Sequence, residues 1–158
     1  MTKRKIMKKQ KFLLIDSNAL IHRSFHALPP LRIRTGQNVG AVYGFTSTLL
    51  KAIEDIKPDF IAATFDLPAP TFRHEQYSEY KANRSKPADE LIEQIPYTKE
   101  VLRALNIPIF ELAGYEADDL IGTICNKISN FPASPAGRQY PISNQYPMKM
   151  HLIWCWIF

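Results

Sequence analysis

Residues 12–16 read FLLID, residues 60–66 read FIAATFD, and residues 116–119 read EADD. The first two stretches are short apolar runs that each end on an aspartate, a pattern typical of buried strands in a parallel sheet. Between them, residues 39–56 repeat apolar side chains at three- and four-residue steps, which predicts an amphipathic helix. Strands that alternate with helices indicate an α/β fold with a mainly parallel sheet flanked by helices.

The same patterns predict the remaining elements. A third short strand is expected over residues 108–112. Pro96 is expected to kink the longest of the later helices, because proline cannot donate the helical hydrogen bond. Ser17 or Asn18 is expected to cap the first helix. The helices are expected over about residues 19–26, 71–84, 87–105 and 115–128.

Composition narrows the class of protein. The chain has 158 residues, of which 46% are hydrophobic and 22% charged, as in ordinary globular domains. No apolar run approaches the roughly 18 residues of a membrane span, and no apolar segment follows the basic N-terminus as in a secretory signal. The two cysteines, Cys125 and Cys155, form neither a disulfide framework nor a zinc motif. We therefore expect a cytoplasmic protein.

Both ends of the chain differ from its middle. Six lysines and arginines lie within residues 1–11, before the first acid, and they account for the net charge of +5. This basic leader is either a solvated terminus or an arm that binds phosphates. No Asp or Glu follows Asp119, and residues 130–158 contain four of the twelve prolines. We expect residues 130–158 to form an irregular tail.

Acidic residues follow each of the predicted strands. The carboxyl ends of parallel strands meet at one sheet edge, where ligands bind in open α/β sheets. A single aspartate at such a place is often only a helix cap, and acids in a first helical turn complement the helix dipole. Five together repel one another without a cation, and their hard oxygen atoms favour Mg²⁺ or Mn²⁺. Such sites are typical of phosphoryl transfer or phosphodiester hydrolysis. The five are Asp16, Asp66, Glu116, Asp118 and Asp119.

The predicted helix over residues 71–84 combines cations with aromatic rings. Its helical spacing would align these side chains on one face, which could contact phosphates and stack on unpaired bases. Glu75 and Glu79 leave open a second interpretation, an exposed helix with internal ion pairs. The aligned residues are Arg73, Tyr77, Tyr80 or Lys81, and Arg84.

Five motifs in residues 12–129 together resemble the N-terminal part of the 5′-3′ exonuclease domain of bacterial DNA polymerase I, in the flap endonuclease superfamily. They are FLLIDSNALIHRSFHALPPL (12–31), GAVYGFTSTLLKAI (40–53), FDLPAPTFRHEQYSEYKANR (65–84), QIPYTKEVLRALNIP (94–108) and GYEADDLIGT (114–123). The resemblance implies a PIN-like, or resolvase-like, fold with a two-metal Mg²⁺ site. It further implies hydrolysis of DNA at 5′ flaps, nicks and single-stranded 5′ ends, and removal of RNA primers.

The resemblance also assigns roles to residues. It implies that the five acids are the metal ligands and that residues 71–95 form a helical arch through which the 5′ strand passes. Lys81 would be the catalytic residue at the scissile phosphate. Contacts to DNA would come from Arg23, Arg73, Tyr77, Tyr80, Lys81 and Arg84.

The sequence departs from the family at three places. Ser17 stands where the family commonly has glycine. The family continues beyond residue 129 with a strand that ends in two more aspartates, and then with a further helical module, and residues 130–158 match neither. We therefore expect a truncated chain with an incomplete sheet and a weakened second metal position. A nucleic-acid-binding remnant without catalysis, or a product without a stable fold, are the alternatives.

Overall fold

The computed structural model describes residues 10–77, 79–82, 86–129 and 149–153. Its centre is a parallel sheet with the strand order β3-β2-β1-β4. Asp16 at the end of β1 is paired with Thr64 at the end of β2, so both strands finish at the same edge. The strands are β1 (Lys11–Asp16), β2 (Phe60–Thr64), β3 (Ile109–Phe110) and β4 (Lys149–Ile153).

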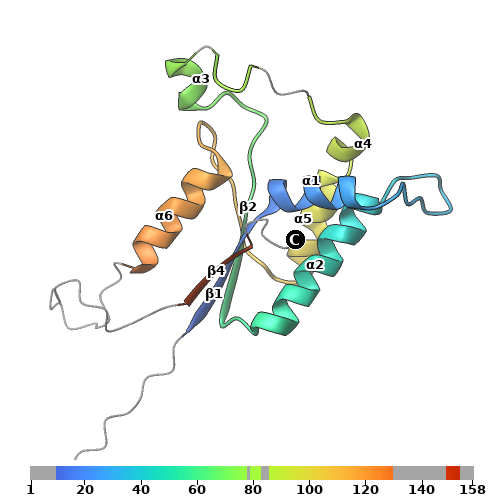
Figure 1. Cartoon of the computed structure of the whole chain (residues 1–158), viewed down its shortest axis with the longest axis horizontal. Coiled ribbons are helices and arrows are strands. Elements are labelled where there is room, and N and C mark those ends of the chain that lie inside the picture. Colours follow the sequence, from blue (N-terminus) through green and yellow to red (C-terminus); the bar gives the residue numbers. More distant parts are fainter. Residues whose placement is uncertain (1–9, 78, 83–85, 130–148, 154–158) are drawn as a thin grey trace, which may run out of the picture.

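Helices cover both faces of this sheet, as Figure 1 shows. One face carries α1 (Ser17–Ala27), α2 (Gly40–Ile56) and α5 (Ile95–Ala104), and the other carries α6 (Ala117–Ser129). Two short helices, α3 (Phe72–Gln76) and α4 (Asp89–Ile92), lie beyond the carboxyl ends of the strands. The predicted α/β fold with a parallel sheet is confirmed.

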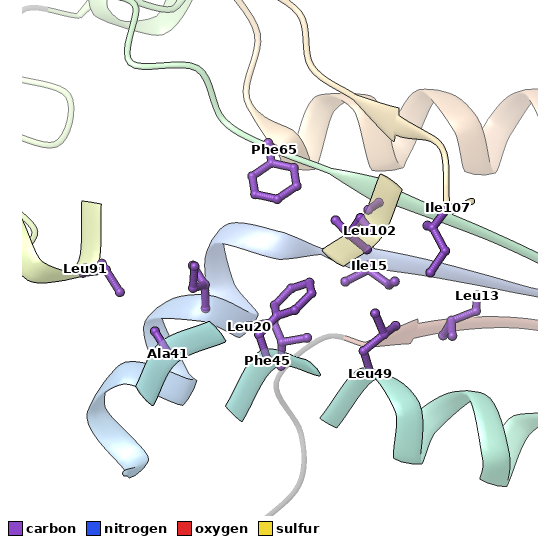
Figure 2. Close-up of a cluster of buried hydrophobic side chains, with 12 residues drawn as sticks. Leu13, Ile15, Leu20, Ala41, Phe45, Leu49, Phe65, Leu91, Leu102 and Ile107 are labelled. Carbon is purple, nitrogen blue, oxygen red and sulfur yellow. The ribbon is translucent and has the colours of Figure 1, made fainter. Parts of the chain in front are cut away.

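The two faces follow from the alternation of side chains along β1. Leu13 and Ile15 point into the larger core beneath α1, α2 and α5, where Phe45 and Leu49 of α2 meet them (Figure 2). Leu14 points to the opposite face and packs in a smaller cluster beneath α6. All five side chains are inaccessible to solvent, which explains why the strand reads as a continuous apolar run.

A buried glutamine between α4 and α5 caps the first turn of α2 with its side chain. Gln94 is 1% exposed, and its Oε1 atom accepts hydrogen bonds from the N–H groups of Ala41 (2.9 Å) and Val42 (3.4 Å). Its Nε2 atom donates to the Glu90 carbonyl oxygen at 2.8 Å. The first N–H groups of a helix have no partner within the helix, so this side chain supplies the missing acceptor.

Replacing that glutamine is expected to destabilise the fold. Gln94→Leu keeps the volume but leaves the buried Ala41 N–H without an acceptor, which costs about 1–3 kcal/mol. Urea unfolding should show the loss as a lower midpoint, whereas Gln76→Leu, at an exposed position of α3, should leave the midpoint unchanged. An unchanged midpoint for Gln94→Leu would show that the cap contributes nothing.

Two predicted helices differ from the structure. The helix expected over residues 71–84 ends at Gln76, and Tyr77 is already extended, with φ −136°. No side chain of α3 is buried, so no apolar face holds a longer helix together. The helix expected over residues 87–105 is divided into α4 and α5, with Pro96 in the first turn of α5. Proline is tolerated there because those N–H groups need no helical partner.

The prediction of an irregular tail is wrong for residues 149–153. They form β4, which pairs with β1 from Lys11↔Lys149 to Ile15↔Ile153. This strand covers the edge of β1 that an incomplete sheet would have left open. Residues 1–9 of the leader, and residues 130–148 and 154–158 of the tail, lie outside the described residues. Among the described helices, none has both the length and the apolarity to cross a membrane.

Candidate functional site

Three segments are joined at the carboxyl edge of the sheet by two aspartates. Asp16 Oδ1 accepts the N–H of Ala19 at 3.0 Å, so Asp16 itself caps α1, and the prediction that Ser17 or Asn18 would do so is wrong. The strand passes directly into the helix, which leaves its last residue as the cap. Asp66 Oδ1 accepts the N–H of Ala117 at 2.6 Å and so ties the end of β2 to the start of α6.

Asn18 completes this connection, and sequence reasoning assigned it no part in the site. Its Nδ2 atom donates to Asp66 Oδ2 at 3.3 Å, and its Oδ1 atom accepts the Asp66 N–H at 3.4 Å. A polar amide two residues after a strand-terminal aspartate was the available signal. Neighbouring Ser17 is fully buried, and its hydroxyl has no hydrogen-bond partner in the described part of the chain.

Negative charge at this edge is only partly compensated. Burial raises the pKa of Asp16, and the charges of Asp118 and Asp66 raise it further, against the hydrogen bond from Ala19. The ionised form of Asp16 is therefore disfavoured in the folded chain. A cation placed among these three carboxylates would reverse that effect.

Asp16→Asn is accordingly expected to stabilise the metal-free chain at neutral pH. Because the carboxyl pKa is raised in the folded chain, ionised Asp16 lowers the free energy of unfolding. This loss of stability is complete above the folded-state pKa and absent below the unfolded-state pKa of about 3.9. Asparagine keeps an oxygen that can cap α1. Thermal unfolding in a chelator should show a higher Tm for Asp16→Asn at about pH 7 and no difference at about pH 3.

Asp89→Asn, at an exposed acid that begins α4, is the matched control and should lack this pH-dependent gain. If Asp16→Asn is less stable than the unmodified chain at neutral pH, the negative charge of Asp16 does not destabilise the folded chain.

A second pair of acids is held by an arginine from α3. Arg73 donates two parallel hydrogen bonds to Asp119, Nη1 to Oδ2 at 2.7 Å and Nη2 to Oδ1 at 2.6 Å. Its Nη1 atom also lies 3.7 Å from Glu116 Oε2. The hydrogen bonds from Arg73 lower the pKa of Asp119, and the same contact raises the pKa of Arg73. One guanidinium thus contacts both acids.

Two further side chains, those of Lys81 and Tyr80, contact Glu116. Lys81 Nζ lies 2.7 Å from Glu116 Oε1, and the Tyr80 hydroxyl donates to Oε2 at 3.2 Å. Burial opposes ionisation of Glu116, but these hydrogen bonds and the charge of Arg73 outweigh it, so the pKa of Glu116 is lowered. Lys81 adopts a left-handed backbone conformation, with φ 59°, which costs a non-glycine residue about 1–3 kcal/mol.

The segment that carries these cations is anchored to the loop before α6. The N–H of Phe72 donates to the carbonyl oxygen of Gly114 at 3.0 Å, and the rings of Phe72 and Tyr115 lie 5.7 Å apart. Thr71 and His74 form a reciprocal cap at the start of α3. This anchoring brings Arg73 to the acids of α6.

The predicted nucleic-acid contacts are only partly brought together. The expected stripe along one helix is wrong, because α3 ends at Gln76 and Lys81 reaches Glu116 from the non-helical chain that follows. Tyr77 is 68% exposed, and Arg23 is an exposed residue of α1. Arg84 lies outside the described residues.

The donor set suits a hard divalent cation, although its present arrangement does not enclose one. All five acids offer carboxylate oxygens from three segments, which is the ligand chemistry of Mg²⁺ and Mn²⁺. Within the described residues, no group of three His, Cys, Asp or Glu side chains is arranged to hold a metal ion. Two of the five acids are engaged by Arg73 and Lys81 instead.

The parallel sheet, with acids gathered at its carboxyl edge and two cations paired with them, defines an α/β domain with a charged site at that edge. The model of the 5′-3′ exonuclease N-terminal resolvase-like domain matches residues 11–134. The chain belongs to this family.

Several similar proteins are bacterial DNA polymerases I. The chain is 45% identical over 120 residues to DNA polymerase I of Caldicellulosiruptor bescii, 46% over 116 residues to that of Bacillus subtilis, and 47% over 124 residues to that of Mycobacterium tuberculosis. These matches cover 76%, 73% and 77% of this chain. The chain spans only 13–14% of the length of these relatives.

Solved structures share the fold. The T5 D15 protein co-crystallised with metal ions matches with a TM-score of 0.55 and 24% identity, over 75% of this chain and 45% of that protein. The T5 5′-exonuclease with bound zinc matches with a TM-score of 0.56, also at 24% identity, over the same 75% and 45%.

Proposed function

We propose that the acidic edge of this chain is the active site of a metal-dependent 5′-3′ exonuclease or flap endonuclease of the DNA polymerase I type. Its substrates would be DNA with a 5′ flap or nick, single-stranded 5′ ends and RNA primers, in replication and repair in the cytoplasm. One observation carries this proposal: the acids that follow β1 and β2 and those at the start of α6 lie at one sheet edge, where Arg73 pairs with Asp119 and Lys81 pairs with Glu116.

Mg²⁺, or Mn²⁺ in its place, would be held by the carboxylates of Asp16, Asp66, Glu116, Asp118 and Asp119. When bound, such ions lower the pKa of a water molecule and stabilise the leaving oxygen of the phosphodiester. The chain's own hydrogen bonds support this arrangement. Asn18 and the Ala117 N–H fix both oxygens of Asp66, so that carboxylate is oriented before any ion arrives.

The basic side chains would bind the substrate. Lys81 would act as the electrostatic catalyst at the scissile phosphate, because its ammonium group already lies within 2.7 Å of a proposed metal ligand. Arg23, Arg73 and Arg84 would contact neighbouring phosphates. Tyr77 and Tyr80 would stack on unpaired bases of the 5′ strand, since base stacking on aromatic rings is tolerant of sequence.

A second function is favoured by one feature of the sequence. No Asp or Glu follows Asp119, so residues 120–158 offer no carboxylate for a second metal position. A chain with one weak metal position and intact cations would bind 5′ strands without cutting them. Two-metal hydrolysis needs ions about 3.5–4 Å apart.

Cleavage of a labelled substrate tests both functions. The purified chain is mixed with duplex DNA that carries a 5′-labelled single-stranded flap, first with Mg²⁺, then with Mn²⁺, then with a chelator. We expect short 5′ products with either ion and none with the chelator. Mobility shifts of the same samples report binding.

The outcomes separate the two functions. Binding without any product in either ion would support the non-catalytic function and contradict the nuclease. Cleavage that persists in the chelator would show that the acidic edge does not act through a metal ion. Neither binding nor cleavage by a folded chain would contradict both functions.

A further inference from the structure

The guanidinium of Arg73 occupies the position between two carboxylates where a cation would be expected. It bonds both oxygens of Asp119 at 2.6 and 2.7 Å and lies 3.7 Å from Glu116. Asp119 Oδ2 also accepts the N–H of Glu116 at 3.0 Å, so this oxygen has no lone pair left for an ion while the fork of hydrogen bonds from Arg73 is in place. The second acid is engaged further by Lys81.

We propose that Arg73 is a built-in counterion that holds Glu116 and Asp119 in the metal-free chain and must be displaced when a divalent cation binds. This inference rests on the proposed function, because it requires those two acids to be metal ligands. Two cations that compete for the same carboxylates have linked affinities, and removing the internal one strengthens the external one.

Displacement would also free the cations for the substrate. Arg73 and Lys81 both belong to the segment of residues 71–82, whose helix α3 has no buried side chain. Lys81 is strained, and its ion pair with Glu116 helps to hold it in place. Once these ion pairs open, the segment remains attached through Phe72, and its two positive charges can turn to a phosphate. Metal binding would thus precede, and promote, binding of the nucleic acid.

A purely structural ion pair would behave differently. Removing it would lower the stability of the chain and leave metal affinity unchanged or weakened. If Arg73 instead competes with the metal ion for the carboxylates, removing its charge should increase the affinity of the chain for the metal. Metal affinity measured without DNA therefore distinguishes the two roles, and this measurement does not depend on catalysis.

The test is a Mn²⁺ titration of the full chain without DNA, followed by the electron paramagnetic resonance signal of the free ion. Arg73→Gln is compared with the unmodified chain and with Lys51→Gln, which removes the same charge and an exposed ion pair on α2. We expect Arg73→Gln to lower the Kd for Mn²⁺ about fivefold, the value of a partly exposed ion pair. Lys51→Gln should leave the Kd unchanged.

Tryptic cleavage of the unmodified chain is the second measurement, and it needs no variant. Cleavage after Arg73 and Lys81 should be faster with Mn²⁺ than with a chelator. Should Arg73→Gln fail to fold by circular dichroism, Arg73→Lys replaces it, because lysine keeps the charge but cannot form the fork.

Each outcome decides. If the unmodified chain binds Mn²⁺ and Arg73→Gln has an unchanged or raised Kd, the counterion role of Arg73 is contradicted. The proposed function is unaffected by that result. Unaltered trypsin cleavage on metal binding likewise contradicts the counterion role. Absence of Mn²⁺ binding in the unmodified chain and in both variants overturns the counterion and the proposed nuclease together.

Discussion

Asp118→Asn is expected to reduce flap cleavage by about a hundredfold or more while the chain stays folded. Asp118 is an exposed residue in the first turn of α6, and its charge lies close enough to Asp16 to raise the pKa of that carboxyl. Removing the charge takes one ligand from the proposed metal site. Stability should change little, because the side chain is exposed to solvent. Initial rates with excess enzyme, and thermal unfolding of both proteins, measure the two effects.

Asp55→Asn is the matched control for this substitution. Asp55 is an exposed acid on α2 whose charge pairs with Lys51, away from the sheet edge. The Asp55→Asn variant should cleave the flap at the same rate as the unmodified chain. Equal cleavage by Asp118→Asn and Asp55→Asn would show that Asp118 is not a ligand.

Phe45→Ala is expected to have the largest effect on stability, a loss of about 3–5 kcal/mol. Phe45 is fully buried at the centre of the larger core, between α1, β1 and α5 (Figure 2). The substitution removes the ring's contacts and leaves a cavity among side chains that can only partly close it. A domain of this size is typically stable by about 5–15 kcal/mol, so much of the total would be lost. Urea unfolding followed by circular dichroism measures the change.

Tyr43→Ala tests the specificity of that effect. It truncates an aromatic ring two residues earlier on the same helix, where the side chain is 58% exposed. Its midpoint should match that of the unmodified chain within error. Equal losses for the two variants would indicate that α2 is sensitive to any truncation and that its buried face has no special part in the core.

The strands, and the helices with a strong apolar face, could be predicted from the sequence. The continuous run Leu13–Ile15 reads as a buried strand because both of its faces are covered, and β1 is found there. The apolar repeat of residues 39–56 predicts α2 to within one residue. The three segments that carry the acids also meet as expected, because parallel strands place their carboxyl ends at one edge.

The segment after Gln76 could not be predicted, since its conformation depends on distant partners. Residues 71–84 look helical by their own composition, yet Lys81 turns into the left-handed region where it contacts Glu116. That contact spans 35 positions along the chain. The paired hydrogen bonds between Arg73 and Asp119 could not be predicted either, because these residues are 46 positions apart along the chain.

Strand β4 was missed for a related reason. Residues 149–153 follow a stretch rich in proline, and the apolar run of residues 152–158 is too short to distinguish a strand from an irregular end by its pattern alone. Their strand conformation depends on the hydrogen-bonding edge that β1 presents to them. Pairing partners far apart in sequence decide such strands, and local propensity contributes little.

Saturable binding of Mn²⁺ by the full chain is the most direct test of the metal site on which the proposed nuclease depends. The unmodified chain and Asp118→Asn are titrated side by side without DNA, and the signal of the free ion is followed at matched ionic strength. The site described above predicts saturable binding to the unmodified chain and weaker or no binding to Asp118→Asn. Equal binding by both proteins, or none by either, would contradict a divalent-metal site at the carboxyl edge of the sheet.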